Sequence, residues 1–234
     1  MILIINFNVK ILVVRILFVA PHPDDECDNA GGTLAKLAKS HDIYIVYLTD
    51  GSAGSPNPEE RGEKLAEIRR REAVEGLKVL GIKKDNAFFL NYPDTKLRFY
   101  IWEASVKVAE IIKEIKPNII IYPSLLDGHN DHWSGGYITR IAIRKVGIAV
   151  NELSYLNWLP IPSKSVFDVI KYLLIPFHRK IKVDVREYKR IKLEAMKKHE
   201  SQFKYLDANY IKKFFDSDYE TFYVEGIVNE MLVA

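Results

Sequence analysis

The 234-residue sequence predicts a single α/β domain, with a mostly parallel central sheet and helices on both of its faces. The main observation is that apolar, β-branched stretches alternate four times with amphipathic helical stretches within about 120 residues. A second observation is that polar, turn-forming residues follow the predicted strands. The carboxyl ends of parallel strands share one edge of a sheet, where α/β proteins bind their ligands. An apolar content of 48% is enough for a core.

The first predicted strand covers residues 14–20, an apolar run typical of a buried strand. It ends in Pro21-His22-Pro23-Asp24-Asp25-Glu26, where two prolines keep the backbone extended and prevent an early helix start. Residues 29–33 then lead into a helix over residues 34–39. Acidic residues in such a turn can cap the next helix, but one carboxylate is enough for capping. One histidine with three carboxylates therefore predicts a functional site at this strand end.

Strands and helices continue to alternate up to residue 146. Further strands are predicted over residues 42–48, 87–90 and 118–123. Amphipathic helices are predicted over residues 59–80, 101–115 and 133–146. The strand over 118–123 is as apolar as the first, which favours a central place in the sheet. The loop after it, residues 126–132, should therefore lie at the same sheet edge as residues 21–26.

The two ends of the chain are less regular. Residues 1–14 are expected to form an extra N-terminal strand or a leader, and residues 151–185 an elaborated lobe of the same domain. Within that lobe we expect an apolar helix over 166–174 and a half-exposed strand over 181–185. A lysine-rich helix over 187–203 follows, and the chain closes with an aromatic stretch around residues 222–224. No repeat, linker or low-complexity tract divides the chain.

Composition narrows the possible partners and the compartment. The formal charge is +3, from 34 basic and 31 acidic residues, and no basic run has interleaved aromatic residues, so no nucleic-acid partner is expected. Asn6, Asn8 and Lys10 interrupt the apolar start well before the ~20 residues that a membrane helix needs, so no membrane partner is expected. The one cysteine, Cys27, excludes an internal disulfide and favours a reducing cytoplasm. A homo-oligomer is left open.

Two turns about 100 residues apart should meet at the ends of neighbouring strands. Together they offer the side chains of His22, Asp24, Asp25, His129, Asp131 and His132. Two histidines and one carboxylate, with a position left for water, form the ligand set of catalytic zinc hydrolases. A further carboxylate could take a proton from that water and return it to a leaving amine. The sequence thus predicts a zinc-dependent hydrolase.

The motifs add a family resemblance. The run 21–26 followed by Ala30-Gly31-Gly32-Thr33, together with His129-x-Asp131-His132, resembles the PIG-L/LmbE family of zinc-dependent de-N-acetylases. The likeness extends through residues 49–51, Arg69-x-x-Glu72 and 199–202, and so covers about residues 14–203. It implies a Rossmann-like fold and removal of the N-acetyl group from N-acetylglucosamine in a small glycoside or glycolipid. The segment 166–177 has no counterpart and is where substrate specificity should differ.

The resemblance also implies a role for each residue. It makes His22, Asp25 and His132 the Zn²⁺ ligands and Asp24 the general base. His129 would stabilise the oxyanion while Asp131 holds the His129 ring. The remaining assignments come from the residues themselves, and each keeps an alternative.

Arg69 is expected to bind a sugar hydroxyl or phosphate, the alternative being a helix-surface ion pair with Glu72. Asp94 is expected to touch substrate, the alternative being a turn former. Glu26 is expected to anchor its loop through backbone N–H groups rather than bind metal. Cys27 is expected to pack in the core. The other histidines, 41, 178 and 199, are expected to be surface or structural residues.

The substrate is expected to be a small amino sugar. A single glutamine among many lysines, glutamates and isoleucines resembles a heat-adapted composition, which makes a chitin-derived disaccharide a candidate. One alternative keeps the chemistry but acts on another sugar-conjugated amide or acylamine. A second alternative is a non-catalytic module that binds a sugar or nucleotide. The absence of Gly-x-Gly-x-x-Gly after the first strand speaks against nucleotide binding.

Overall fold

The computed structural model describes residues 13–161 and 165–226, so the predicted N-terminal strand or leader lies almost entirely outside the described residues. A seven-stranded sheet has the order β3-β2-β1-β4-β5-β7-β6. Its strands are β1 (Arg15–Ala20), β2 (Asp42–Thr49), β3 (Ala87–Tyr92), β4 (Ile119–Pro123), β5 (Asn151–Tyr155), β6 (Lys180–Asp184) and β7 (Tyr219–Val224). The five strands from β3 to β5 are parallel, whereas β7 runs antiparallel to both β5 and β6.

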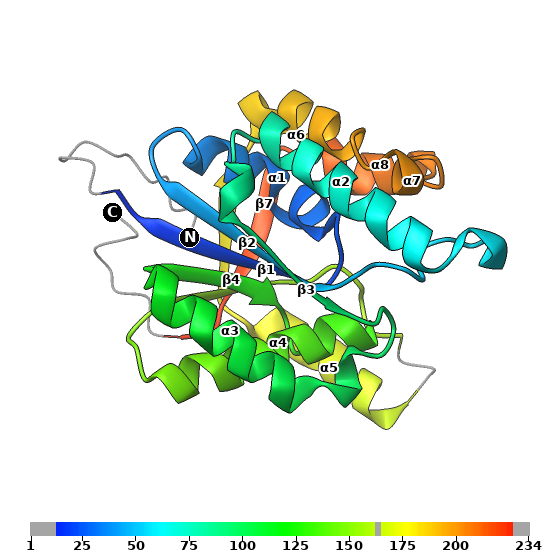
Figure 1. Cartoon of the computed structure of the whole chain (residues 1–234). Coiled ribbons are helices and arrows are strands. Elements are labelled where there is room, and N and C mark those ends of the chain that lie inside the picture. The colour runs from blue at the N-terminus through cyan, green and yellow to red at the C-terminus, as the bar shows by residue number, and fades with distance from the viewer. Residues whose placement is uncertain (1–12, 162–164, 227–234) are drawn as a thin grey trace.

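Helices cover both faces of the sheet, as predicted (Figure 1). One face carries α1 (Asp25–Leu37), α2 (Glu63–Val79), α6 (Lys189–Met196), α7 (Glu200–Phe203) and α8 (Ala208–Phe215). The other face carries α3 (Ile101–Ile115), α4 (Asn130–Val146) and α5 (Val166–Leu174). Within the described residues, no helix is both long and apolar enough to cross a membrane.

The central strand β1 contributes to two cores because successive side chains point to opposite faces. Ile16 and Phe18 pack with α1 and α2 on one face, and Leu17 and Val19 pack with α3 and α4 on the other. Every residue of β1 after Arg15 is buried. The buried strand therefore fixes the position of its own carboxyl end, where the turn of residues 21–26 begins.

The helix after β1 begins at Asp25, nine residues before the predicted start. Residues 29–33, which were expected only to lead into the helix, lie inside α1, and the pair Gly31-Gly32 lies where this helix approaches its neighbours closely. A Cβ on Gly32 would lie 2.7 Å from Cβ of Val185, and one on Gly31 would lie 2.9 Å from Cγ of Lys192. The glycines thus serve helix packing, and the early start places Asp25 in the first turn of α1.

The C-terminal part differs most from the prediction. In the segment 151–185, the predicted helix is found as α5 and the predicted strand as β6, but β5 was not predicted, and both strands belong to the central sheet. The predicted helix over 187–203 is divided into a short 3-10 turn, α6 and α7, because the chain turns the buried side chain of His199 into the core. The sequence pattern does not predict α8, and it predicts only an aromatic stretch where β7 lies.

Candidate active site

The two predicted turns meet at the carboxyl ends of β1 and β4, which pair in parallel. The rings of His22, His129 and His132 lie 5.2 to 5.4 Å apart between centroids. A cavity of about 210 Å³ opens beside them. Its lining includes the predicted site residues His22, Asp24, Asp25, Arg69, Asp94, His129 and His132. Asp131 lies directly behind His22, so all eight predicted site residues are in one place.

The start of α1 directs Asp25 back toward His22. The Asp25 carboxylate accepts a hydrogen bond from the His22 amide at 2.8 Å, and its Oδ2 lies 3.4 Å from Nδ1 of His22. Its other oxygen lies 3.2 Å from Nε2 of His132. Burial raises the pKa of Asp25, but His132 and His22 together hold that pKa well below its usual value. Asp25 is therefore an ionised carboxylate between two imidazoles.

His22, Asp25 and His132 form a candidate metal-binding group. One ligand atom from each lies within 4.8 Å of the others, and Asp25 and His132 are buried. Two imidazole nitrogens and one carboxylate fit a divalent ion that keeps an open coordination position. The chemistry of the donor set therefore suits the predicted metal.

A second carboxylate orients His132. Oδ2 of Asp127 lies 3.4 Å from Nδ1 of His132, which has no hydrogen-bond partner of ideal geometry among the described residues. Burial lowers the pKa of His132, but Asp25 and Asp127 outweigh burial and raise it to about 10. A carboxylate behind a histidine ligand is typical of metal sites. Sequence reasoning missed Asp127, although its position in the loop that follows a central strand was a usable signal.

Asp24 lies at the cavity with its carboxylate partly exposed. Oδ2 of Asp24 accepts a hydrogen bond from Nη2 of Arg69 at 3.0 Å. Burial raises the pKa of Asp24 to about 6, with Asp25 adding to the rise and Arg69 opposing it. A carboxyl group with a pKa close to neutrality can both accept and return a proton.

Arg69 is buried, and the alternative of a helix-surface ion pair with Glu72 is wrong. Its guanidinium donates to the carbonyl oxygens of Gly51 at 2.9 Å and Pro23 at 2.7 Å, in addition to Asp24. A Cβ on Gly54 would lie 2.1 Å from Nη1 of Arg69, so a side chain there would displace the guanidinium. Arg69 therefore ties the loop after β2 to the loop after β1.

Two further carboxylates face the other side of the His22 ring. Nε2 of His22 lies 3.1 Å from Oδ1 of Asp94 and 3.3 Å from Oδ2 of Asp131. Burial lowers the pKa of His22, but Asp94, Asp131 and Asp25 outweigh burial and raise it well above its usual value. Asp94 also accepts a hydrogen bond from the Ala53 amide at 3.0 Å. Asp94 thus lines the cavity while contacting a candidate metal ligand.

The predicted contact between the Asp131 carboxylate and the His129 ring is not what the structure shows. The carboxylate accepts hydrogen bonds from the amides of Thr95 at 2.7 Å and Leu97 at 3.1 Å, and faces His22. The backbone amide of Asp131 donates to Nδ1 of His129 at 3.3 Å. The physical reason is that His129 caps α4, so its ring turns toward the first amides of that helix.

His129 is suited to donate a hydrogen bond into the cavity. Burial lowers its pKa, and the neighbouring His22 and His132 lower it further, which favours the neutral ring. Since Nδ1 accepts from the Asp131 amide, the proton of the neutral ring belongs on Nε2.

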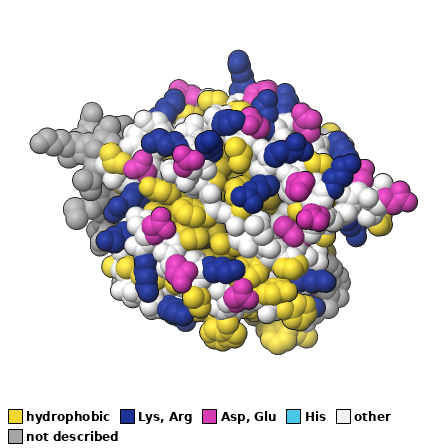
Figure 2. All heavy atoms as spheres, viewed as in Figure 1, with side chains coloured by type: hydrophobic (Ala, Val, Ile, Leu, Met, Phe, Trp, Pro, Cys, Tyr) yellow, Lys and Arg dark blue, Asp and Glu magenta, His cyan; other side chains and the backbone are white. Residues whose placement is uncertain are grey.

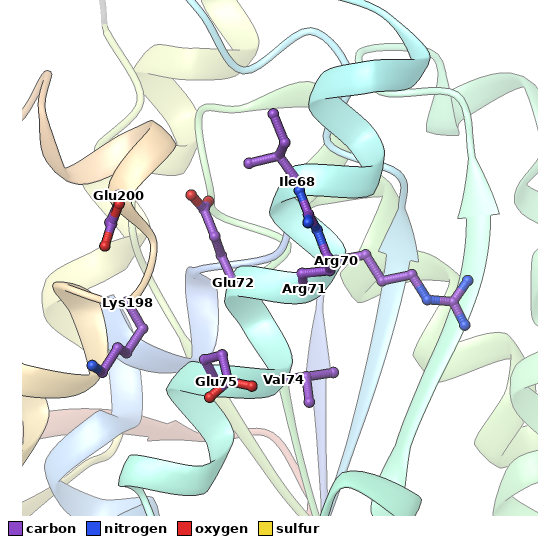
Figure 3. Close-up of a pocket in the computed structure, with 8 residues that line it drawn as sticks. All are labelled: Ile68, Arg70, Arg71, Glu72, Val74, Glu75, Lys198 and Glu200. Carbon is purple, nitrogen blue, oxygen red and sulfur yellow. The ribbon is translucent and has the colours of Figure 1, made fainter.

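A larger hollow of about 800 Å³ lies elsewhere, on the outer surface of α2 near α7 (Figure 3). Its lining residues are Ile68, Arg70, Arg71, Glu72, Val74, Glu75, Lys198 and Glu200. It has charges of both signs but no histidine, so it offers no group comparable to the histidine cluster. Basic and acidic side chains are also interspersed across the face in Figure 2, in line with the small net charge.

Comparison with known proteins identifies the family. The PIG-L family model, described as GlcNAc-PI de-N-acetylase, matches residues 17–143, more than half of the chain and all eight predicted site residues. The chain belongs to the PIG-L family. The predicted family and the predicted α/β fold are thereby confirmed.

Individual relatives support this membership. The diacetylchitobiose deacetylase of Thermococcus kodakarensis is 32% identical over 195 residues, which cover 82% of this chain and 71% of that protein. The 1D-myo-inositol 2-acetamido-2-deoxy-alpha-D-glucopyranoside deacetylase of Thermomonospora curvata is 29% identical over 164 residues, 60% of this chain and 53% of that protein. The chain therefore spans about half of the second relative. As these relatives are deacetylases, the prediction of a hydrolytic enzyme is confirmed.

A solved structure supports the fold. The N,N'-diacetylchitobiose deacetylase from Pyrococcus horikoshii, in complex with an inhibitor, superposes with a TM-score of 0.67. The superposition covers 90% of this chain and 83% of that chain, at 21% sequence identity.

Proposed function

We propose that this PIG-L family member hydrolyses the N-acetyl group of an N-acetylglucosamine-containing small glycoside, releasing acetate and a free amine. The observation that carries the proposal is the convergence, in one cavity, of a His-Asp-His metal-binding group and a carboxyl group whose pKa is near 6. The relatives named above act on N-acetylated amino sugars, which supports the substrate class. A chitin-derived disaccharide is our first candidate, because the relative with 32% identity is a diacetylchitobiose deacetylase.

His22, Asp25 and His132 would hold Zn²⁺ as the cofactor. A bound zinc ion supplies Lewis-acid chemistry: it lowers the pKa of water to about 7 and polarises a carbonyl oxygen. Asp127 keeps the His132 ring oriented from behind, and Asp131 and Asp94 do the same for His22.

Asp24 takes the proton from the attacking water and returns it to the nitrogen of the leaving amine. Arg69 fixes the Asp24 carboxylate and leaves its second oxygen for this transfer. Nε2–H of His129 donates a hydrogen bond to the acetyl oxygen as negative charge develops on it.

Arg69 and Asp94 are proposed as substrate-binding residues because both line the cavity. Oδ2 of Asp94 accepts from the Ala53 amide, and Oδ1 lies 3.1 Å from Nε2 of His22, so a sugar hydroxyl would donate to the remaining lone pair of Oδ1. A cytoplasmic location and the oligomeric state stay predictions. The location is supported by the single cysteine, Cys27, which is free and buried.

The proposal is tested with a substrate panel. N-acetylglucosamine, its β-linked disaccharide and an N-acetylglucosaminyl inositol are incubated with the enzyme, and primary amine and acetate are both measured. Equal amounts of the two products from at least one sugar are expected, lost with chelator and restored by zinc. Sugar binding without either product would indicate a binding module. Release from a non-sugar acylamine alone would indicate the alternative substrate class.

A further inference from the structure

The backbone at Asp24 is strained. Its φ of 139° and ψ of −22° differ from the other described non-glycine residues with positive φ, which cluster between 51° and 68° in the left-handed region. Such a sparsely populated conformation is unfavourable for a non-glycine residue and persists only where the surrounding structure enforces it. The general base of the proposed reaction therefore needs a structural support.

Part of this support comes from the buried carboxylate of Glu26. Oε2 of Glu26 accepts a hydrogen bond from the Asp24 amide at 3.2 Å, and the Glu26 side chain is completely buried. This contact confirms the expectation that Glu26 anchors the loop through a backbone N–H group. It fixes the peptide plane before Asp24, whereas Arg69 fixes the carboxylate.

Glu26 is in turn fixed by a residue far along the chain. Oε1 of Glu26 lies 3.1 Å from Nε2 of His199, which is also completely buried and sits between α6 and α7. Cys27 donates its thiol to the same oxygen at 3.4 Å. Burial lowers the pKa of His199, but Glu26 outweighs burial and raises it, which favours an ion pair.

Neighbouring elements make room for His199 and hold its segment. A Cβ on Gly76 of α2 would lie 2.9 Å from Nε2 of His199. Ser201, two residues after His199, donates from its amide and its hydroxyl to the Glu72 carboxylate of α2 at 2.9 and 2.6 Å. The segment 199–202 is therefore attached to α2 through Ser201 and to the start of α1 through the contact of His199 with Glu26.

Glu26, Cys27 and His199 also have the spacing of a metal-binding group. However, both oxygens of Glu26 already accept hydrogen bonds, one from the Asp24 amide and one shared by His199 and Cys27. The contacts therefore describe a hydrogen-bonded support rather than a second metal site.

We propose that His199 and Glu26 are positioning residues for the general base: His199 fixes Glu26, and Glu26 holds the strained Asp24 peptide so that its carboxylate faces the cavity. This inference rests on the proposed function, because it takes Asp24 as the base. Neither residue touches substrate, so their effect must reach the reaction through Asp24.

The test compares three variants. His199→Leu removes the partner of Glu26, His199→Gln keeps a donor toward it, and Glu72→Gln weakens the other attachment of the same segment. We expect kcat of His199→Leu to fall by ~10²-fold, the usual effect of a misplacement near 1 Å. Its KM and zinc content should stay within twofold of wild type. His199→Gln should recover most of kcat, and Glu72→Gln should keep it even where its melting temperature falls.

A wild-type kcat in His199→Leu would overturn the inference, as would an equal loss in Glu72→Gln or a loss of zinc. If His199→Leu does not fold, Gly76→Ala, whose methyl group displaces His199, is measured with the same expectations.

A crystal structure separates this inference from the proposed function. If the wild type releases no amine from any substrate, the proposed function fails. The φ angle of Asp24 in the His199 variant then still decides the present inference. A shift to negative φ supports it, and an unchanged φ overturns it.

Discussion

Replacing Asp127 with asparagine tests the support behind the proposed metal ligand His132. Oδ1 of Asp127 accepts from the His129 amide at 2.8 Å. Oδ2 accepts from the amides of Asn157 at 2.9 Å and Trp158 at 3.2 Å, and lies 3.4 Å from the His132 ring. An asparagine has one acceptor oxygen, so its NH₂ group must face at least one of these backbone donors.

The expected decrease in the free energy of unfolding of Asp127→Asn can be estimated from these contacts. In one orientation the NH₂ group opposes the single amide of His129, and in the other it opposes two amides and the His132 ring. A hydrogen bond to a charged group contributes about 1.5–3 kcal/mol, so the free energy of unfolding should fall by roughly 2–4 kcal/mol. His132 also loses its negative partner, which should weaken zinc binding by ~10–100-fold.

Two measurements on one protein preparation check the prediction: chemical unfolding, and zinc competition against a chelating dye. Asp85→Asn, which makes the same charge change at an exposed position, is the matched control and should leave both unchanged. Zinc affinity within twofold of wild type in Asp127→Asn would refute the reasoning, because it would show that Asp127 does not act on the metal site through His132.

Three further predictions follow from other contacts. Gly136→Ala should lower the free energy of unfolding by about 1–3 kcal/mol or more, because the added Cβ would lie 2.3 Å from the carbonyl oxygen of Pro123; unchanged urea unfolding would contradict this. Asp28 accepts a hydrogen bond from Tyr210, and burial together with Asp24 raises the pKa of Asp28 to about 8. Since an unfolded aspartate titrates near ~4, native Asp28 keeps a proton that the unfolded chain has lost, and stability falls as pH rises from about 4 to 8. Asp28→Asn should therefore gain stability relative to wild type between pH 5 and pH 8 in urea unfolding, and an equal pH dependence of both proteins would exclude this origin. His129→Ala should keep its zinc and lose ~10²–10³-fold in kcat, as expected for one oxyanion donor; a zinc-free variant would make His129 a ligand instead.

The sequence was most informative where local pattern and topology agree. Two apolar strands, each followed by a polar turn, were enough to predict that His22 and His132 come together, because parallel strands end at the same sheet edge. The same logic placed Asp24 and Asp25 beside them. The assignment of these side chains as metal ligands or general base came from the family resemblance rather than from their spacing.

The sequence was least informative where partners come from distant segments. The Asp131 carboxylate accepts hydrogen bonds from the backbone amides of Thr95 and Leu97. Because every residue except proline has such an amide, the sequence does not show which ones will be the donors. β5, with the sequence Asn-Glu-Leu-Ser-Tyr, lacks a strong apolar pattern and becomes a strand through pairing with β4 and β7. The predicted helix over 187–203 is interrupted because His199 reaches Glu26, a partner 173 positions earlier.

The most direct test of the whole account is the zinc content and amine release of Asp24→Asn beside Asp25→Ala. Asp24 lines the cavity as the proposed base, whereas Asp25 lies between the two proposed histidine ligands. The account predicts that Asp24→Asn keeps one zinc ion per chain and loses ~10²–10⁴-fold in turnover, and that Asp25→Ala loses both zinc and activity. A zinc-free Asp24→Asn beside a zinc-replete Asp25→Ala would contradict it.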